Sequence, residues 1–257
     1  HCAGSLTSVA NAAASIRSGM DRAIIAGGVM STSLAPITTW KVPGTDEKTM
    51  RMAPTFPHYE GANDDVTIST GWIPAQELNL SREEVDAWAL RSHQRAIAAT
   101  DAGHFADEIV PVMIRNAEGR EVEFKVDEYA RRDTTMEKLA ALKVLHPEIE
   151  GFSVTAGNSS GINDAAAVVA LASPGTQQNV LASVLSWTQV GLDPTRTGSG
   201  PIKAIPKALE LAGRKLEDVA LFEINEAFAA QAVACARELG LDEDIVNVYG
   251  SGISLGH

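Results

Sequence analysis

The stretch Val219-Ala-Leu-Phe-Glu-Ile-Asn-Glu-Ala-Phe-Ala-Ala230 decides the fold class of this chain. Its apolar residues 219–224 predict a strand, and the alanine-rich residues 227–239 predict a helix that Gly240 ends. Asn225 lies at the junction, where an asparagine serves either as a helix N-cap or as an amide that holds a water or a substrate carbonyl. A strand that runs directly into a helix is typical of an α/β protein.

The same pattern extends in both directions from this stretch. The predicted elements are a helix at 3–20, an apolar strand at 22–29 that we expect to be buried, a strand at 180–190, a helix at 201–212 that Gly213 ends, and a strand at 246–249. Residues 158–172 are rich in small side chains, as close helix–sheet packing requires. We therefore expect α/β segments at both ends of the chain.

Residues 31–157 have a different character. Residues 31–80 are rich in Ser, Thr, Pro and Gly, and Ser81 with Glu84 then forms a capping box that starts a helix. The spacing places Val85, Trp88, Ser92 and Ala96 on one face of this helix. A hairpin at 108–115 and 120–126 and a short helix at 134–142 follow. We therefore expect residues 31–157 to be an insertion between α/β segments.

Composition narrows the function classes. The 257 residues can bury a sizeable core, and aromatics at 5% favour helices packed on sheets over an aromatic-rich all-β sandwich. A net charge of −12 argues against a nucleic-acid or anionic-membrane surface, so an anionic ligand needs a local basic spot. Cys2 and Cys235 lie in unlike contexts, which favours a reducing, cytoplasmic location over a disulfide framework.

Cys2 and His257 are the most reactive candidates. Cys2 is expected at the start of a helix, where a thiol is acidified, and its small neighbours leave backbone N–H groups open to an oxyanion. Most intracellular cysteines are packing residues, and a lone histidine is most often structural. A histidine after the glycine-rich run 250–256, in a chain with a helix-start cysteine, is a better candidate for a base.

Residues Thr155-Ala-Gly-Asn-Ser-Ser-Gly-Ile-Asn-Asp164 form a further polar cluster. They are either a turn with a helix cap or a set of hydroxyl and backbone groups that line an extended polar ligand.

Together these clusters resemble the thiolases, the acyl-CoA acyltransferases that make or cleave 3-ketoacyl-CoA. The resemblance covers the whole chain in the family's order. It rests on Cys2-Ala-Gly-Ser5, the helix Ser81–Ala96, Val154-Thr-Ala-Gly-Asn-Ser-Ser-Gly-Ile-Asn-Asp164, Leu221-Phe-Glu-Ile-Asn-Glu-Ala-Phe-Ala229 and Leu255-Gly-His257, which fits the family's Gly-His-Pro.

The resemblance implies the thiolase fold, an α/β architecture in five αβαβα layers that is built from two similar halves with an inserted loop domain. Residues 1–30 and 158–184 would belong to the first half, 31–157 to the loop domain and 185–257 to the second half. Both halves are expected to be incomplete. Thiolases are dimers or tetramers, so a homo-dimer or homo-tetramer is expected.

The resemblance also assigns roles. Cys2 would attack the thioester and carry the acyl group, His257 would activate Cys2, and Asn225 would position a water in the oxyanion site. Coenzyme A would be a substrate or product, with no permanently bound cofactor and no metal. The residues expected to contact it are Ala156, Ser160, Ile162, Ala227 and Phe228, with Arg131 or Arg132 at the nucleotide end.

The sequence departs from the family pattern at several points. The family's second catalytic cysteine lies in a Cys-x-Gly turn downstream of the histidine, and Cys235, placed in mid-helix, does not correspond to it. We therefore expect the chain to be a piece of a longer protein, and we expect this piece to be inactive by itself. Thr67-Ile-Ser-Thr-Gly-Trp-Ile-Pro74 replaces a stretch that usually contains Met-Gly beside the acyl site, and Ser251 replaces a second glycine.

Two other functions remain open at this point. A ketoacyl synthase also uses a cysteine nucleophile, but it usually has histidines where this chain has Asn225-Glu-Ala-Phe228. A thiolase-like protein that binds CoA or lipid without turnover is the other alternative, and the presence of Cys2, Asn225 and His257 favours chemistry over it.

Overall fold

The computed structural model describes residues 2–35, 39–50, 65–176 and 179–257. They form two compact units. Unit 1 comprises His1–Asp65, Ile162–Thr195 and Lys203–Asp218, and unit 2 comprises Val66–Gly161, Arg196–Ile202 and Val219–His257. The boundaries expected for the two halves and the loop domain stay a prediction.

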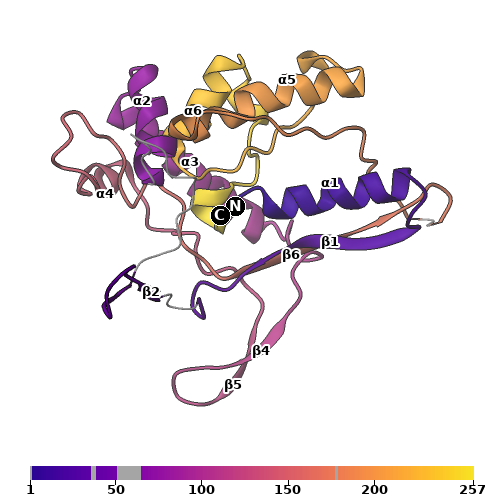
Figure 1. The fold of residues 1–257 in the computed structure, drawn as a ribbon, viewed down its shortest axis with the longest axis horizontal. Coiled ribbons are helices and arrows are strands. Elements are labelled where there is room, and N and C mark those ends of the chain that lie inside the picture. The colour runs from indigo at the N-terminus through magenta and orange to yellow at the C-terminus, as the bar shows by residue number, and fades with distance from the viewer. Residues whose placement is uncertain (1, 36–38, 51–64, 177–178) are drawn as a thin grey trace. The chain divides into compact units, whose positions relative to one another are not determined.

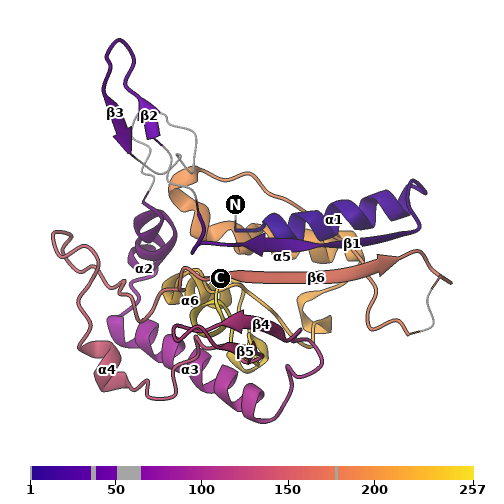
Figure 2. The same cartoon turned by 90° about the horizontal axis from the view of Figure 1, so that it is seen from below.

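Unit 1 is built on a two-stranded antiparallel sheet. Strand β1 (Ala23–Met30) pairs with β6 (Ala165–Ala172), with Ala23 opposite Ala172 and Met30 opposite Ala165. Helix α1 (Gly4–Arg17) runs beside β1 (Figures 1 and 2). Ser8 Oγ donates to the carbonyl of Gly27 at 2.7 Å, and a Cβ on Gly28 would lie 2.7 Å from Ser5 Cβ. Glycine on β1 is therefore what lets α1 approach so closely.

The strand predicted at 22–29 is confirmed, but its predicted burial is wrong. Ala26 is buried, whereas the side chains of Ile25 and Val29 are 76% and 79% exposed. Successive side chains of a strand point to opposite faces, and α1 covers only the face that bears Ala26 and Gly28. Within the described part of unit 1, Ile25 and Val29 consequently remain open to solvent.

The strand predicted at 180–190 is wrong. The structure assigns no strand to these residues. The Arg17 guanidinium donates to the carbonyls of Val184 and Leu185, at 2.9 and 3.0 Å, and Ser186 Oγ donates to Ala208 O at 2.7 Å. The carbonyls of Val184 and Leu185 are thus bound by a side chain and not by a neighbouring strand, because apolar composition alone cannot supply a pairing partner.

Helix α5 (Gly200–Ala212) confirms the helix predicted at 201–212, and Gly213 follows it with φ of 64°. Its residues are divided between the two units at Ile202. The short elements of this part of the chain and of residues 39–50 are β2 (Thr39–Lys41), β3 (Lys48–Met50), η2 (Pro194–Ser199) and η3 (Leu216–Asp218).

Unit 2 is organised around α3 (Arg82–Asp101). The predicted capping box is present, because Ser81 Oγ accepts from the N–H of Glu84 while the Glu84 carboxylate accepts from the N–H of Ser81. The predicted shared face of Val85, Trp88, Ser92 and Ala96 is the buried face of the helix, since all four are at most 4% exposed. This helix contacts α4 (Met136–Ala140), α6 (Ala229–Glu238) and α7 (Gly252–Leu255).

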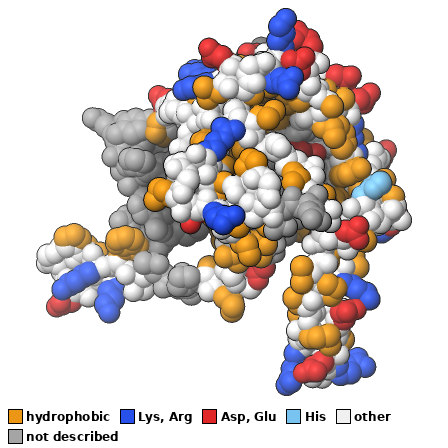
Figure 3. Space-filling view, turned by 90° about the vertical axis from the view of Figure 1, so that its right-hand side faces the viewer, with side chains coloured by type: hydrophobic (Ala, Val, Ile, Leu, Met, Phe, Trp, Pro, Cys, Tyr) orange, Lys and Arg blue, Asp and Glu red, His pale blue; other side chains and the backbone are white. Residues whose placement is uncertain are grey.

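Two smaller structures complete unit 2. The π-helix η1 (Thr67–Trp72) runs into α2 (Ile73–Glu77), and Ile68 and Trp72 pack against a buried cluster of Phe152, Val154 and Phe228. The predicted hairpin forms from β4 (Val112–Arg115) and β5 (Glu121–Phe124). Figure 3 shows it as an arm bearing both signs of charge, in keeping with its surface ion pairs.

The strands predicted at 219–224 and 246–249 are reduced to isolated bridges, one of them the parallel bridge between Phe222 and Val246. The predicted helix at 227–239 begins only at Ala229, with Phe228 as its N-cap, so Asn225 does not cap it. Phe228 has extended dihedrals and pairs with Ser159, which keeps residues 225–228 out of the helix. Across the described ranges, every helix is too short or too polar to cross a membrane.

Candidate active site

Unit 2 brings Asn225 and His257 together. The Asn225 side-chain amide is in hydrogen-bond contact with Nδ1 of His257, and both side chains are exposed. A neutral imidazole that accepts at Nδ1 carries its proton on Nε2 and presents a donor there. With the amide turned, Oδ1 would accept from Nδ1–H and leave Nε2 as a base. The amide orientation therefore selects between a proton acceptor and an oxyanion donor.

Polar contacts and close packing hold the backbone that precedes each of these two residues. The Asn247 amide bonds both the N–H and the carbonyl of Ile224, each at 2.8 Å, and so replaces a missing strand neighbour. Ser251 Oγ donates to the same carbonyl at 3.3 Å. A Cβ on Gly252 would lie 2.8 Å from Asn225 Oδ1, so the turn before His257 needs glycine there.

Cys2 lies in unit 1 and is exposed. Helix α1 begins at Gly4 with Ala3 as its N-cap, so Cys2 immediately precedes the cap. The first turn has no acidic residue and no side-chain cap, which leaves backbone N–H donors and the positive end of the helix dipole near the thiol. Because Asn225 and His257 belong to unit 2, the assembly of the three residues into one site stays a prediction.

Cys235 has no place in this chemistry. It is fully buried in α6, as predicted, and burial raises the pKa of its thiol to about 11. Its sulfur lies 3.6 Å from the carbonyl of Gly198, a packing contact. A thiol in these surroundings is protonated at neutral pH and is a poor nucleophile.

Four of the residues expected to contact CoA lie on two adjoining segments of unit 2. The Ser160 N–H donates to Ala227 O at 3.0 Å, and the Ala229 N–H donates to Asn158 O at 2.9 Å. These bonds lay residues 156–160 along 227–229, so Ala156 and Ser160 lie on the segment that borders Ala227 and Phe228. Ile162, at 85% exposed, belongs to unit 1.

The two candidate arginines differ. Both Nη atoms of Arg132 bind the carboxylate of Asp101, at 2.8 and 2.5 Å. The Arg131 guanidinium lies 6.0 Å from the centre of the Tyr129 ring, and no described carboxylate forms an ion pair with it. Arg131 is thus the better placed of the two to receive a phosphate.

Sequence reasoning missed the polar residues on the inner face of α3. Asp86, 1% exposed, accepts from Arg82 Nε at 2.7 Å and from Asn158 Nδ2 at 2.8 Å. Asn158 Oδ1 in turn accepts from the N–H of Thr155, which fixes the polar loop. The signal was available at Ser92, a hydroxyl on a face otherwise predicted to be apolar, which lies in contact with Glu226.

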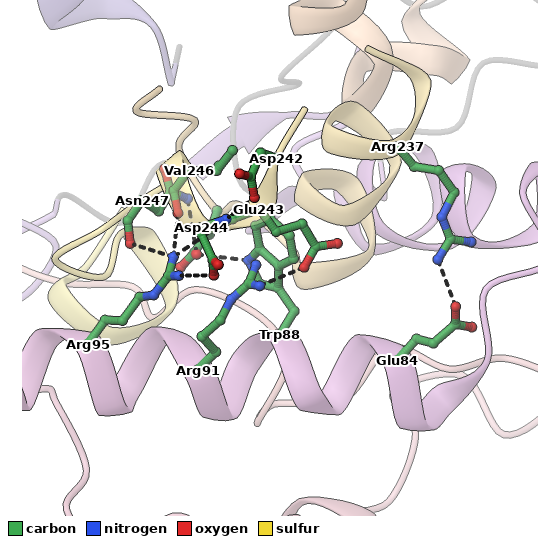
Figure 4. A network of polar contacts seen from close by, with 11 residues as sticks. Glu84, Trp88, Arg91, Arg95, Arg237, Asp242, Glu243, Asp244, Val246 and Asn247 are labelled. Atoms are coloured by element: carbon green, nitrogen blue, oxygen red, sulfur yellow. Dashed lines mark hydrogen bonds and ion pairs between the residues drawn. The ribbon is translucent and has the colours of Figure 1, made fainter. Parts of the chain in front are cut away.

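Further along α3, arginines tie the helix to the C-terminal part of unit 2 (Figure 4). Arg95 Nη1 donates to the carbonyl of Val246 at 2.6 Å, and Arg91 pairs with Glu243 at 2.5 Å while stacking over Trp88. At the other end of the helix, Arg237 pairs with Glu84 at 2.7 Å. No cluster of His, Cys, Asp or Glu in the described part of the chain has the arrangement of a metal site.

The fold and these signatures define a thiolase-type acyltransferase, and comparison with known proteins agrees. Residues 1–174 match the model of the thiolase N-terminal domain, and residues 178–257 match that of the thiolase C-terminal domain. The chain belongs to the thiolase family, whose members are acyl-CoA acyltransferases.

Individual relatives are similar over the whole chain. A β-ketoadipyl-CoA thiolase of Acinetobacter baylyi and an acetyl-CoA acetyltransferase of Paracoccus denitrificans are each 41% identical over 100% of this chain, which covers 67% and 66% of their lengths. Among solved structures, the Bacillus anthracis acetyl-CoA acetyltransferase has a TM-score of 0.87 at 37% identity, and human mitochondrial 3-ketoacyl-CoA thiolase has 0.84 at 34%. In both cases 100% of this chain and 66% of the solved chain are covered.

These comparisons confirm the predicted thiolase fold and acyltransferase class. The chain spans about two thirds of the length of the relatives it matches.

Proposed function

We propose that this protein makes or cleaves 3-ketoacyl-CoA through an acyl-enzyme on Cys2. The observation that carries the proposal is the contact between Asn225 and His257, two side chains that the thiolase signatures pair, on a chain matched by both thiolase domain models. Cys2 would supply the nucleophile, His257 the base and oxyanion donor, and Asn225 a water held in the same oxyanion site. Coenzyme A is the substrate or product, with no permanently bound cofactor.

In the thiolysis direction, the proposed chemistry begins when His257 takes the proton of Cys2 and the thiolate attacks the 3-keto carbon. A Sγ–C bond forms, the C2–C3 bond of the substrate breaks, and the electron pair leaves as the enolate of acetyl-CoA, which then accepts a proton. Attack by CoA sulfur on the acyl-enzyme releases the shortened acyl-CoA and returns Cys2. Each preorganised donor to the oxyanion is worth about 3 kcal/mol of barrier.

The proton that the enolate accepts must come from a second acid. In the family this is the cysteine of the Cys-x-Gly turn, downstream of His257 and so outside residues 1–257. Cys235 does not replace it, since its thiol is buried and its pKa is raised to about 11. Condensation follows the same steps in reverse.

The remaining proposals concern ligand contacts and setting. Ala156, Ser160, Ala227 and Phe228 would border the pantetheine, Ile162 would lie beside it, and Arg131 would contact the nucleotide phosphates, with Arg132 as the alternative. We further infer a homo-dimer or homo-tetramer from the resemblance. Two cysteines in unlike surroundings support a cytoplasmic location.

The test is acyl-enzyme formation from acetyl-CoA labelled in the acetyl group, carried out in the full-length protein. Cys2→Ala is expected to abolish covalent labelling, because Cys235, the other thiol within residues 1–257, is buried, and the downstream cysteine of the Cys-x-Gly turn would act as an acid and not as the nucleophile. Mass spectrometry of the labelled peptide identifies the modified residue.

Cys235→Ala is the matched control, since it removes the buried thiol and should leave labelling intact. Label retained in the Cys2→Ala variant would overturn the assignment of the nucleophile.

A further inference from the structure

Glu226 is a fully buried carboxylate that directly follows Asn225 in the chain. Its side chain is 1% exposed. From residue 221 to residue 226 the chain alternates between exposed and buried positions, so Asn225 faces outward and Glu226 inward. A substitution at Glu226 therefore changes no atom on the exposed face that carries Asn225.

Four hydrogen bonds hold this carboxylate. Oε1 accepts from Trp88 Nε1 at 2.8 Å and from Asn247 Nδ2 at 3.1 Å. Oε2 accepts from Ser92 Oγ at 2.6 Å and from the N–H of Ile253 at 3.3 Å. No cation among the described residues lies within ion-pair distance of it, so these four donors, together with the more distant charge of Arg95, compensate the burial of the carboxylate.

The four donors come from three different parts of unit 2. Trp88 and Ser92 lie one turn apart on α3, Asn247 lies in the segment that replaces a strand beside Ile224, and Ile253 lies in α7. Figure 4 shows Trp88 on α3 and Asn247 on the C-terminal segment, the two residues that donate to Oε1. Ser92 Oγ also lies 2.8 Å from Ser254 Oγ, a second link from α3 to α7.

The consequence concerns both partners of the Asn225–His257 contact. Asn225 is the residue before Glu226, and His257 is the second residue after α7, whose Ile253 N–H the carboxylate binds. One side chain therefore fixes the backbone that carries the amide and the backbone that carries the imidazole.

We propose that Glu226, held by Trp88 and Ser92 of α3, is a positioning residue that sets the placement of His257 against Asn225. The inference rests on the proposed function for its effect on turnover, but its structural part stands on these contacts alone. It assigns to α3 a role in the reaction that acts through Glu226.

Glu226→Gln tests the proposal because glutamine preserves size but offers one acceptor oxygen in place of two. If the amide oxygen faces Trp88 and Asn247, its NH₂ faces the Ile253 N–H, and two donors oppose each other. The opposite orientation sets the NH₂ against Trp88 and Asn247. The first orientation opposes fewer donors, so the variant should loosen α7 in particular.

The expected result in the full-length protein is a fall of kcat by about 10- to 100-fold, with KM for acyl-CoA within about twofold of wild type, because misplacement of a catalytic group slows chemistry more than binding. The Asn225 side-chain amide and the His257 ring resonances in NMR spectra should shift, which a purely global loss of stability would not produce. Ser92→Ala keeps the carboxylate and removes one donor, so it should show the same shifts with a smaller fall in kcat, and it carries the test if Glu226→Gln does not fold.

Arg237→Gln is the matched control. It breaks a tie between α3 and α6 that touches neither Glu226 nor α7, and it should leave kcat and both sets of resonances unchanged. Wild-type kcat with unshifted resonances in Glu226→Gln would overturn the inference, as would an equal fall of kcat in Arg237→Gln. Shifted resonances in a protein whose wild type has no thiolase activity would support the positioning role and remove the proposed function.

Discussion

At the scale of single residues, the structure separates two adjacent arginines that the sequence left equivalent. The Arg132 guanidinium is engaged at both ends by Asp101, and this bidentate hydrogen bond lowers the pKa of the Asp101 carboxyl. The Arg131 guanidinium lies near the Tyr129 ring and forms no ion pair with a described carboxylate, while its backbone N–H donates to His93 Nδ1 at 3.2 Å. An anchored backbone and an exposed guanidinium suit a residue that receives a phosphate.

We predict that Arg131→Gln raises KM for CoA by about tenfold with little change of kcat, because a charge-assisted hydrogen bond contributes roughly 1.5–3 kcal/mol. Arg132→Gln should raise KM by less than about threefold, since its charge is already compensated. Steady-state thiolysis with varied CoA measures both. Equal effects of the two variants would show that Asp101 releases Arg132 when the ligand binds.

At the scale of elements, α3 is stabilised at its first turn by contacts that share one carboxylate. A hydrogen bond from Arg237 lowers the pKa of Glu84 to about 2 from its ordinary 4.5, and the backbone N–H and hydroxyl of Ser81 add to this effect. The capping box could be predicted because its two residues are three apart in sequence. The ion pair could not, because Arg237 is 153 residues away.

Glu84→Gln should lower the free energy of unfolding by about 0.5 kcal/mol at pH 7, since glutamine still serves in a capping box but the half-exposed ion pair is lost. A depressed folded-state pKa stabilises the fold above pH 4.5, and this contribution is lost as the pH falls from 4.5 towards 2. The difference in the free energy of unfolding between wild type and Glu84→Gln, measured by urea unfolding, should therefore be smaller at pH 3.5 than at pH 7. Glu83→Gln, on the same turn, is the control, and a difference that widens at low pH would contradict the prediction.

At the scale of the whole molecule, the buried residues are distributed unevenly between the units. In unit 2, α3 and α6 contribute Val85, Ala89, Ala96, Ala229, Ala230 and Cys235, all 0% exposed. In the described part of unit 1, the buried apolar residues are Ala12, Ala13 and Ala26, each 5–8% exposed. Local stability follows this density of buried contacts.

In the 257-residue chain, amides of α3 and α6 should exchange with solvent at least about tenfold more slowly than those of β1 and β6. Hydrogen exchange followed by mass spectrometry or NMR measures this difference. Equal protection would mean that a partner, such as a second copy of the chain, covers the exposed side chains of β1.

Helices and caps could be predicted because their determinants are local. The face that bears Val85, Trp88, Ser92 and Ala96 follows from spacing alone, and the structure shows that this face is buried. Strands were wrongly predicted at 180–190 and 219–224, because strand formation depends on a pairing partner that is distant in sequence.

The candidate site divides in the same way. Motifs indicated Asn225 and His257, whereas the donors to Glu226 on α3 lie 134 and 138 residues away and become visible only in the structure.

The alternation of exposed and buried positions at 221–226 has a consequence for how this segment tolerates change. Its side chains can be exchanged at the exposed positions, but its length cannot vary. Loss or gain of a single residue between Phe222 and Asn225 would turn the amide into the interior and the carboxylate out to solvent. Both the exposed pair with His257 and the buried contacts with α3 would be lost together. Insertions and deletions should therefore be absent from this segment in any active variant, whether natural or engineered.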